Sequence, residues 1–474
     1  MAQSSIYINK ISYYFTLLKQ AVHGHQMDYT SGSLRKAVLM LAIPMMLEMC
    51  MESVFAVVDL YFVGHLKDAS HAIQTVGLTE SVLTIIYSLA IGMSMAATAV
   101  VARRIGEKNP EAAAHAGIQA ILIALAITIL ISIAGFIYAA DILRWMGASA
   151  DTVLKGIGFV RIMMGASLVI MLLFLINGIF RGAGNAAMAM KSLWLANACN
   201  IILCPILING LGPIPALGLE GAAWATVIGR GSGVIYQVYH LLKGNSQLKI
   251  KEDHWGPDWA VIGSLVKIAA PGILQFIIGS CSWIFLAQLV ATTGGETGSA
   301  GYQTALRLMM FFLLPAWGLS NAAATLVGQN LGAQQLQRAE ESVMKTIYYN
   351  VIFMAVVTVI FWVFGNYLVS FFTTDEAIGK VAAQAGRIIA SGYIFYGIGM
   401  VMMNTFNGAG DTWTPTIINF CGFWLIQIPL AYTLAKYLAW GPVGVFIAIP
   451  AAETAITIAG YFYFKKGRWK TIKV

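Results

Sequence analysis

The stretch KAVLMLAIPMMLEMCMESVFAVVDLYFVGHL, residues 36–66, decides the fold class. Its apolar run is longer than the roughly 20 residues that a helix needs to cross a bilayer, yet it carries Glu48, Glu52 and Asp59. At about 100° per residue, the two later acids fall within about 40° of the first on the helix surface. Carboxylates at bilayer depth are costly and normally face a water-filled cavity or a partner. The stretch therefore predicts a first membrane helix that performs proton, ion or substrate chemistry.

The composition of the whole chain predicts a polytopic membrane protein. Of its 474 residues, 58% are hydrophobic and 11% are charged, and the mean hydropathy is +0.74. A soluble globular domain carries about 25% charged residues, so a large water-soluble domain is excluded. Apolar runs long enough to cross a bilayer predict twelve spans, at 37–63, 75–102, 112–140, 157–180, 187–210, 218–242, 260–292, 301–328, 342–372, 381–407, 414–438 and 442–464.

The net charge of +8 comes from the segments between the spans. Lys and Arg concentrate at 103–108, 243–251 and 465–473, which lie on the inner side if the N-terminus is cytoplasmic. This distribution follows the positive-inside rule and predicts that both termini are cytoplasmic. We therefore expect a bilayer, and no nucleic acid, as the partner of the basic residues.

No motif of an enzyme is found in the sequence. The five cysteines lie in apolar spans without a CxxC pair, which is typical of packing residues. HExxH and GxxxxGK[ST] are both missing, so neither a zinc peptidase nor an ATP-driven pump is indicated. We expect no catalytic residues, no bound metal and no cofactor.

The chain contains an internal repeat. AIGMSMAATAVVARRIG (90–106) aligns with AWGLSNAAATLVGQNLG (316–332), and GAGN (182–185) aligns with GAGD (408–411) in the same register. Pro44 of the first span corresponds to Pro271 of the seventh. Because each half has an even number of spans, both halves enter the membrane from the same side, which predicts parallel repeats around a cavity. The two prolines are candidate hinges.

This pattern predicts an all-α polytopic membrane protein with twelve transmembrane helices in two pseudo-symmetric six-helix lobes around a central cavity. The expected parts are a cytoplasmic N-terminal segment (1–35), an N-lobe with helices 1–6 (36–242), a cytoplasmic inter-lobe linker (243–258), a C-lobe with helices 7–12 (259–465) and a basic cytoplasmic tail (466–474). The first segment allows two interpretations: a short amphipathic helix on the inner membrane face, or an extension upstream of a native start at Met27.

Several segments together resemble the MATE (multidrug and toxic compound extrusion) family of antiporters. They are AVVDLYFVGHL (56–66), RGAGN (181–185), GLEGAAWAT (218–226) and NGAGDTWTP (407–415). The resemblance extends over about residues 30–465. It implies twelve helices in two lobes and the export of organic cations or other amphiphiles in exchange for inward protons or sodium.

The resemblance also implies a site. Asp59 occupies the position of the family's acid in span 1, and Asn200 matches an asparagine in span 5, but Cys204 stands where one branch has an aspartate. Thr226 matches a polar residue of span 6. The segments 271–280 and 391–400 lack the acids that the sodium-linked branch has in spans 7 and 10. We expect Asp59, Glu52 and Glu48 to couple the ion, and polar residues to line the substrate cavity, namely Asn200, Thr226, Asn177, Gln275, Tyr393 and Tyr396.

The preferred function is therefore a secondary active multidrug efflux antiporter driven by protons. Sodium coupling is the first alternative. A lipid-linked sugar flippase of the same superfamily is the second, although it would need a cationic cavity. A non-transporting membrane scaffold or receptor is the third. We expect a monomer in a bacterial plasma membrane, with small cationic or amphiphilic molecules as its ligands.

Overall fold

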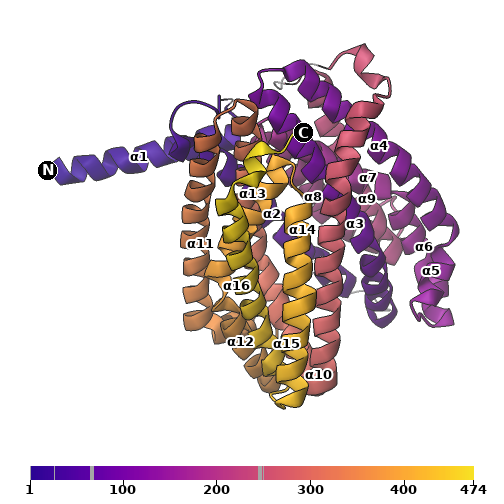
Figure 1. Cartoon of the computed structure of the whole chain (residues 1–474). Coiled ribbons are helices and arrows are strands. Elements are labelled where there is room, and N and C mark those ends of the chain that lie inside the picture. The colour runs from indigo at the N-terminus through magenta and orange to yellow at the C-terminus, as the bar shows by residue number, and fades with distance from the viewer. Residues whose placement is uncertain (1, 26, 65–68, 244–247, 249) are drawn as a thin grey trace. The chain divides into compact units, whose positions relative to one another are not determined.

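A computed structural model describes the backbone of all residues except 1, 26, 65–68, 244–247 and 249 (Figure 1). The side chains of 2–12, 59, 60, 63, 64, 69, 70, 73 and 252 are also outside the description. The described chain is helical, with no strand beyond an isolated bridge between Leu211 and Ile214. The first nine helices are α1 (Ala2–His23), α2 (Leu34–Gly64), α3 (Ala69–Gly106), α4 (Pro110–Ile137), α5 (Ala139–Trp145), α6 (Ala150–Gly165), α7 (Ser167–Gly182), α8 (Ala186–Asn209) and α9 (Leu219–Leu242).

The second half of the chain begins after the short 3₁₀ helix η1 (Glu252–Trp255). Its helices are α10 (Trp259–Gly332), α11 (Leu336–Ser370), α12 (Glu376–Ala390), α13 (Tyr393–Ala409), α14 (Trp413–Phe420), α15 (Ile428–Tyr432) and α16 (Pro442–Lys466). Two π-helical segments, η2 (Cys421–Gln427) and η3 (Thr433–Tyr437), continue the run of α14 and α15, and the 3₁₀ helix η4 (Arg468–Thr471) follows α16.

Helix covers each of the twelve predicted spans, which confirms the all-α membrane fold. In the described residues, nine helices are long and apolar enough to cross a membrane, or ten when the bent pair α12 and α13 is counted as one span. Two predicted spans are missing from this count: the span at 218–242, which is α9, is not among these helices, and two others lie together in α10. Its 74 residues would extend for about 110 Å, several times the thickness of a bilayer core, and the chain turns inside it at Gly295 with φ of 61°. This single element therefore contains two predicted spans.

The chain divides into two compact units whose limits do not coincide with the predicted linker. Unit 1 contains residues 1–49 and 274–474, and unit 2 contains residues 50–273. Helix α2 therefore begins in unit 1 and ends in unit 2, whereas α10 begins in unit 2 and ends in unit 1. The first half of span 1 thus belongs to the unit that contains most of the second repeat, and the first half of span 7 belongs to the unit that contains most of the first repeat. The predicted boundaries at 242 and 259 stay predictions.

Two glycines of the sequence repeat lie where the first halves of spans 1 and 7 pack against their units. In unit 1, Gly318 lies against the backbone of Met45, so that a Cβ atom there would collide with the Met45 carbonyl oxygen. In unit 2, Gly92, which is the repeat partner of Gly318, lies in the same way against Ile273. Both contacts fall one or two residues after the corresponding prolines, at positions 44 and 271. The sequence repeat is thus also a repeat of close helix contacts.

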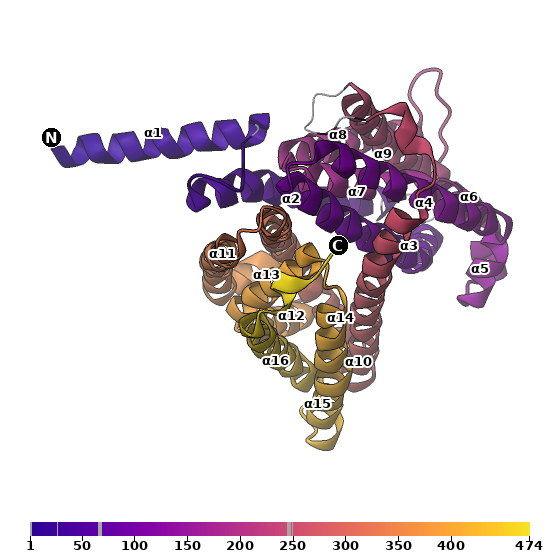
Figure 2. The ribbon, with the colours of Figure 1, turned by 45° about the horizontal axis from the view of Figure 1, so that its top comes forward.

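Unit 2 is built on close pairs of helices, of which α3 with α7 and α8 with α9 are the most extensive (Figure 2). Hydroxyl groups of α3 reach across to the backbone of α7. The Ser94 Oγ donates to the Phe174 carbonyl at 2.9 Å, and the Thr98 Oγ1 donates to the Gly178 carbonyl at 2.9 Å. Small residues at such contacts let membrane helices approach closely, since lipid gives no hydrophobic drive for helix association.

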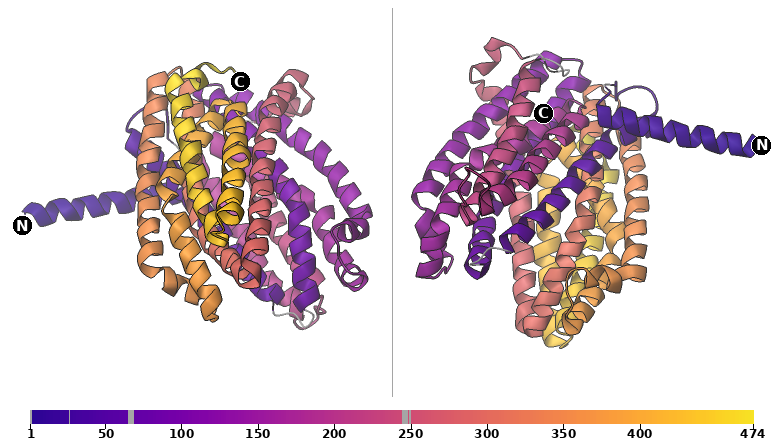
Figure 3. Two further views of the ribbon diagram at one scale, coloured as in Figure 1. Left: turned by 60° about the horizontal axis from the view of Figure 1, so that its bottom comes forward. Right: turned by 180° about the vertical axis from the view of Figure 1, so that it is seen from behind.

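Unit 1 packs the orange and yellow helices α11–α16 into a bundle, seen from two sides in Figure 3. Asn350 of α11 donates to the Gly397 carbonyl of α13 at 2.9 Å. The segment before α2 is held to this bundle by Arg338, whose guanidinium donates to the carbonyls of Ser31 at 2.8 Å and Gly32 at 2.9 Å. These contacts explain why the N-terminal residues belong with the C-terminal helices.

The end of the predicted linker docks on α4 within unit 2. The Gln119 amide donates to the carbonyls of His254 at 2.9 Å and Gly256 at 2.7 Å, and its oxygen accepts from the Asp258 backbone at 3.0 Å. The His115 ring lies 3.2 Å from the Asp258 carboxylate. Residues 244–247 and 249 of this linker lie outside the described residues.

Candidate functional site

Glu52 of α2 is held in unit 2 by two groups from different helices. Arg230 of α9 donates through Nη2 to Glu52 Oε1 at 2.9 Å, and Asn197 of α8 donates through Nδ2 to Glu52 Oε2 at 3.1 Å. The Arg230 side chain is 2% exposed and that of Glu52 is 18% exposed. A charge-assisted pair of this kind compensates for burial that neither charge would tolerate alone.

Aromatic rings surround the guanidinium of Arg230. Its Cζ atom lies 5.0 Å from the ring centre of Phe55, 5.8 Å from that of Phe174 and 6.0 Å from that of Tyr87. The faces of these rings stabilise a cation that has left water.

Asn200 and Thr226 meet beside this pair, as the resemblance implies. The Asn200 Nδ2 donates to Thr226 Oγ1 at 3.0 Å, and the threonine hydroxyl donates to the Ala222 carbonyl at 3.1 Å. The Asn200 Oδ1 is buried and has no hydrogen-bond partner in the part of the chain that the structure describes. Cys204 is fully buried one turn further along α8. The polar residues of this region thus form one stripe along α8 and α9.

Glycines let α9 come close enough to α8 for these bonds to form. A Cβ atom at Gly229 would lie 2.7 Å from the Ala196 carbonyl oxygen and 3.0 Å from the Asn200 backbone nitrogen. At Gly233 it would lie 2.9 Å from the Ser192 carbonyl oxygen. Gly231, between them, has open space around it. Packing against α8 therefore uses one face of α9.

Asn177 belongs to a second buried polar cluster of unit 2. Its Oδ1 accepts from Ser192 Oγ at 2.9 Å and from Gln237 Nε2 at 2.6 Å. The same Gln237 amide also donates to the Leu173 carbonyl at 3.0 Å. The cluster joins α7, α8 and α9, and its bonds indicate a role in holding these helices together. Whether Asn177 lines a substrate cavity stays a prediction.

The other predicted coupling and cavity residues with described side chains lie in unit 1. Glu48 is 1% exposed, and the division between the units falls between it and Glu52. Gln275 is buried, and its Oε1 has no hydrogen-bond partner in the described part of the chain. Tyr393 is buried and Tyr396 is half-buried, both on α13. Asp59 lies outside the described side chains, so its proposed role rests on the sequence.

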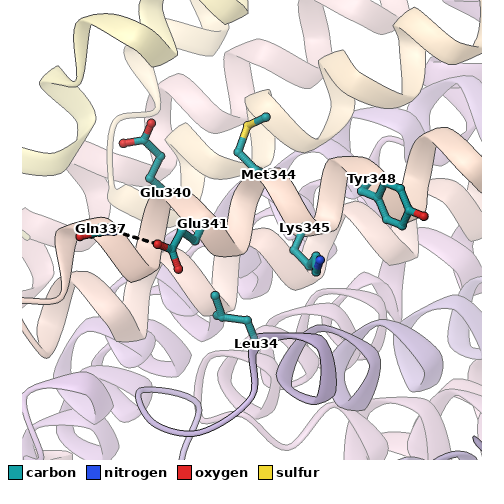
Figure 4. Close-up of a pocket in the computed structure, with 7 residues that line it drawn as sticks. All are labelled: Leu34, Gln337, Glu340, Glu341, Met344, Lys345 and Tyr348. Carbon is teal, nitrogen blue, oxygen red and sulfur yellow. Dashed lines mark hydrogen bonds between the residues drawn. The ribbon is translucent and has the colours of Figure 1, made fainter.

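A separate hollow lies at the start of α11 in unit 1 (Figure 4). It has a volume of 670 Å³ and is lined mainly by one face of the helix, at Gln337, Glu340, Glu341, Met344, Lys345 and Tyr348, with Leu34 opposite. Gln337 donates to Glu341 at 2.9 Å, and Lys470 pairs with Glu340. None of the predicted coupling or cavity residues lines it.

Two residues of the Glu52 site were not among the predicted site residues. Arg230 is recognisable in the sequence as a charge in an apolar span that needs a partner, but nothing in the sequence pairs it with Glu52, 178 residues away. Asn197 lies one turn before Asn200 on α8, so a polar residue on the same helix face was the available signal.

Comparison with known proteins identifies the class to which this architecture belongs. The model of the family described as MatE matches the chain twice, over residues 44–206 and 271–433. The two matches together include more than half of the chain and correspond to the two halves of the sequence repeat. The chain therefore belongs to the MatE family, the MATE transporters.

Curated relatives match almost over their full length. A probable multidrug resistance protein NorM from Thermotoga maritima is 24% identical, with 92% of this chain and 93% of the relative covered. A probable multidrug resistance protein YoeA from Bacillus subtilis is also 24% identical, with 91% and 94% covered. An FAD transporter from Shewanella oneidensis is 24% identical, with 91% and 94% covered.

Solved structures of transporters share the fold. A MOP superfamily transporter from Pyrococcus furiosus has a TM-score of 0.87 and 26% identity, with 92% of this chain and 96% of that chain covered. A MATE structure in the straight conformation has a TM-score of 0.87 and 26% identity, with 92% and 97% covered. These likenesses, together with the apolar helices, show a multi-pass membrane protein of the transporter class.

Proposed function

We propose that the protein is a secondary antiporter that exports organic cations or other amphiphiles and takes up protons in exchange. The observation that carries this proposal is the Glu52 carboxylate, which a membrane helix holds between Arg230 and Asn197. Carboxylates inside membrane segments normally mark ion, proton or substrate pathways. The names of similar proteins, which include multidrug resistance and multidrug export proteins, support the same class of substrate.

Competition for Glu52 supplies the coupling. Arg230 neutralises the carboxylate while their ion pair is intact, and a proton or a cationic substrate neutralises it when the pair is open. Because these partners exclude one another, binding of the proton weakens binding of the substrate, and the reverse holds by linkage. Asp59 and Glu48 are on the same helix, and the sequence predicts that they take part in ion coupling with Glu52. A membrane potential supplies about 2.3 kcal/mol per charge for each 100 mV.

Protons are the preferred ion, because nearby carboxylates and burial on α2 suit a group that exchanges a proton. Sodium coupling is the second candidate. The proposed setting is a bacterial plasma membrane, with the protein as a monomer and both termini in the cytoplasm. Pro44 and Pro271 are proposed as the hinges of the transport cycle, since both precede the exchange between the units.

Proteoliposomes test the coupling directly. A fluorescent organic cation should accumulate when a pH gradient is imposed and not when sodium alone is imposed. Asp59→Asn should fold normally, as judged by gel filtration and melting temperature, but should lose gradient-driven transport entirely. Glu376→Gln, which removes an 83% exposed carboxylate, is the matched control and should transport normally. Unchanged transport by Asp59→Asn would contradict the proposed coupling site.

The same vesicles test the substrate class. One relative is named as an FAD transporter, and a buried arginine can also bind an anion once Glu52 releases it. Uptake of FAD, in the absence of any uptake of organic cations, would replace the proposed substrate by a flavin nucleotide. Uptake of the cation, with no effect of FAD on its rate, would support the proposal.

A further inference from the structure

Unit 1 contains a carboxylic acid that the proposed mechanism does not use. Glu453 lies near the middle of α16, 11 residues after its start at Pro442 and 13 before its end at Lys466. At about 1.5 Å per residue, both helix ends are roughly 17–20 Å away. Its side chain is 3% exposed, and its Oε1 has no hydrogen-bond partner in the part of the chain that the structure describes. A carboxyl group at such depth is a strong sign of function.

Helix α13 fixes the surroundings of this group. The two helices touch on both sides of Glu453. On one side, Gly392 leaves room for Pro450, and a Cβ atom on the glycine would overlap the proline ring. On the other side, the Thr457 hydroxyl donates to the Phe395 carbonyl at 2.6 Å, close to Gly399. Glu453 is therefore held between two rigid contacts and cannot easily turn toward water.

Tyrosines of α13 lie at the level of Glu453. Tyr396, half-buried, lies between Gly392, which contacts Pro450, and Gly399, which contacts Thr457, and so stands at the height of Glu453. The hydroxyl of Tyr393 is buried and, like Glu453 Oε1, has no hydrogen-bond partner among the described residues. The same small region thus contains an acid, two phenols and at least two unsatisfied polar atoms.

Most basic groups of the elements packed against α16 contact other partners, and Arg307 of α10 and Arg468 of η4 are exposed. Arg387 of α12 donates to Asn366 at 3.2 Å, Lys380 pairs with Glu376 at 2.7 Å, and Lys470 of η4 pairs with Glu340. The remaining lysines lie over tyrosine rings, Lys436 over Tyr432, Lys465 over Tyr461 and Lys466 over Tyr463. No ion pair to Glu453 exists within the described residues, so a proton or a bound cation must neutralise it.

We propose that Glu453 is a second proton-carrying carboxyl group of the transporter, placed in unit 1 beside Tyr396 and separate from the acids of α2. This inference rests on the proposed proton coupling. The proton occupies the carboxyl group while the site is closed to water and leaves when the site opens. Because Glu453 lies in the other unit from Glu52, each unit then has its own proton site.

Infrared spectroscopy of the purified full-length protein tests the protonation itself. At neutral pH the wild-type protein should show the stretching band of a protonated carboxyl group, which shifts in heavy water. The band should be lost in Glu453→Gln and kept in Glu376→Gln, whose carboxylate is exposed. A spectrum of Glu453→Gln that equals that of the wild type would overturn the proposal. Should Glu453→Gln fail to fold, Glu453→Asp keeps the carboxyl group and should retain the band with an altered frequency.

Transport separates this inference from the proposed function. Glu453→Gln should still bind an organic cation such as tetraphenylphosphonium but should lose most of the acceleration that a pH gradient gives, and Glu453→Asp should restore part of it. Full proton-driven transport by Glu453→Gln would refute the second site and leave the first intact. Wild-type transport that ignores the pH gradient would refute the proposed function, while the infrared band would still report on Glu453.

Discussion

At the scale of single residues, the ion pair between Glu52 and Arg230 sets a balance between stability and exchange. Arg230 is almost fully buried, so its charge depends on Glu52 as much as the carboxylate depends on the arginine. Glu52 keeps some exposure, and this leaves one side of the pair open to competitors. A pair that was buried on both sides would be a structural element only.

Removal of one partner should reveal this dependence. Arg230→Met leaves the carboxylate among the aromatic rings without its counter-charge, and loss of one partner of a buried pair costs about 3–5 kcal/mol. We expect a clear fall in melting temperature in detergent. The double variant Glu52→Gln/Arg230→Met should recover much of that loss, because no uncompensated charge remains. Additive losses in the double variant would contradict the pairing.

The sequence indicates which residues are candidates for the site, but it does not indicate which residues they contact. Glu48 and Glu52 stand out as charges in an apolar run, and Asn200 and Thr226 stand out through the family resemblance. Asn200 and Thr226 are bonded to each other, and their place in a substrate cavity stays a prediction. The pairing of Glu52 with Arg230 does not follow from any local pattern. Contacts between helices far apart in the chain depend on packing, which hydrophobic periodicity does not encode.

At the scale of elements, the contact between α8 and α9 decides whether the polar stripe can form. The helices approach so closely that backbone atoms of α8 occupy the space beside glycines of α9. A bulkier residue would separate the helices and break the hydrogen bond from Asn200 to Thr226. The glycines thus contribute to the site without touching a ligand.

Neighbouring glycines give a matched test of this contact. Gly229→Ala should lower both melting temperature and transport, because its methyl group would meet the Ala196 carbonyl oxygen at 2.7 Å. Gly231→Ala has open space and should be neutral, or stabilising by up to about 1 kcal/mol since alanine favours helix. Equal effects of the two substitutions would show that helix propensity, and not the close approach of α9 to α8, determines the stability of α9.

The linker end on α4 should respond to acid. Burial lowers the pKa of His254, so its contribution to docking is complete above the ordinary value of about 6.5 and is lost as pH falls below it. Backbone donation from Val261 and then the bond from His115 lower the pKa of Asp258, so its contribution survives to more acidic pH. The protection factor against hydrogen exchange at 250–258, which corrects for the slower intrinsic exchange in acid, should therefore fall below about pH 6.5.

A variant of α4 provides the control for that measurement. Gln119→Leu removes three hydrogen bonds to the linker end that do not titrate. It should raise hydrogen exchange in the same segment at every pH and leave the acid response in place. A protection factor in the wild-type protein that does not change between neutral and mildly acidic pH would contradict a role for His254.

At the scale of the whole molecule, the repeats of the sequence and the units of the structure do not coincide. Apolar runs and the shared register predict two sets of six helices, and helices occur where they are predicted. The exchange of the first halves of spans 1 and 7, which form the starts of α2 and α10, was not predictable in this way. It depends on contacts such as those of Gly318 with Met45 and of Gly92 with Ile273, which join residues from different repeats.

The discontinuity of unit 1 also bears on the order in which the ribosome delivers the chain. Unit 2 is one uninterrupted segment, so all of its residues are available once Ile273 has been synthesised. Unit 1 begins with residues 1–49, which include the start of α2, and these can complete their contacts within the unit only after residues 274–474 follow. Domains tend to fold as units during synthesis, from the N-terminus onward. The N-terminal part of unit 1 is therefore synthesised first, although unit 1 is the last of the two units to be completed.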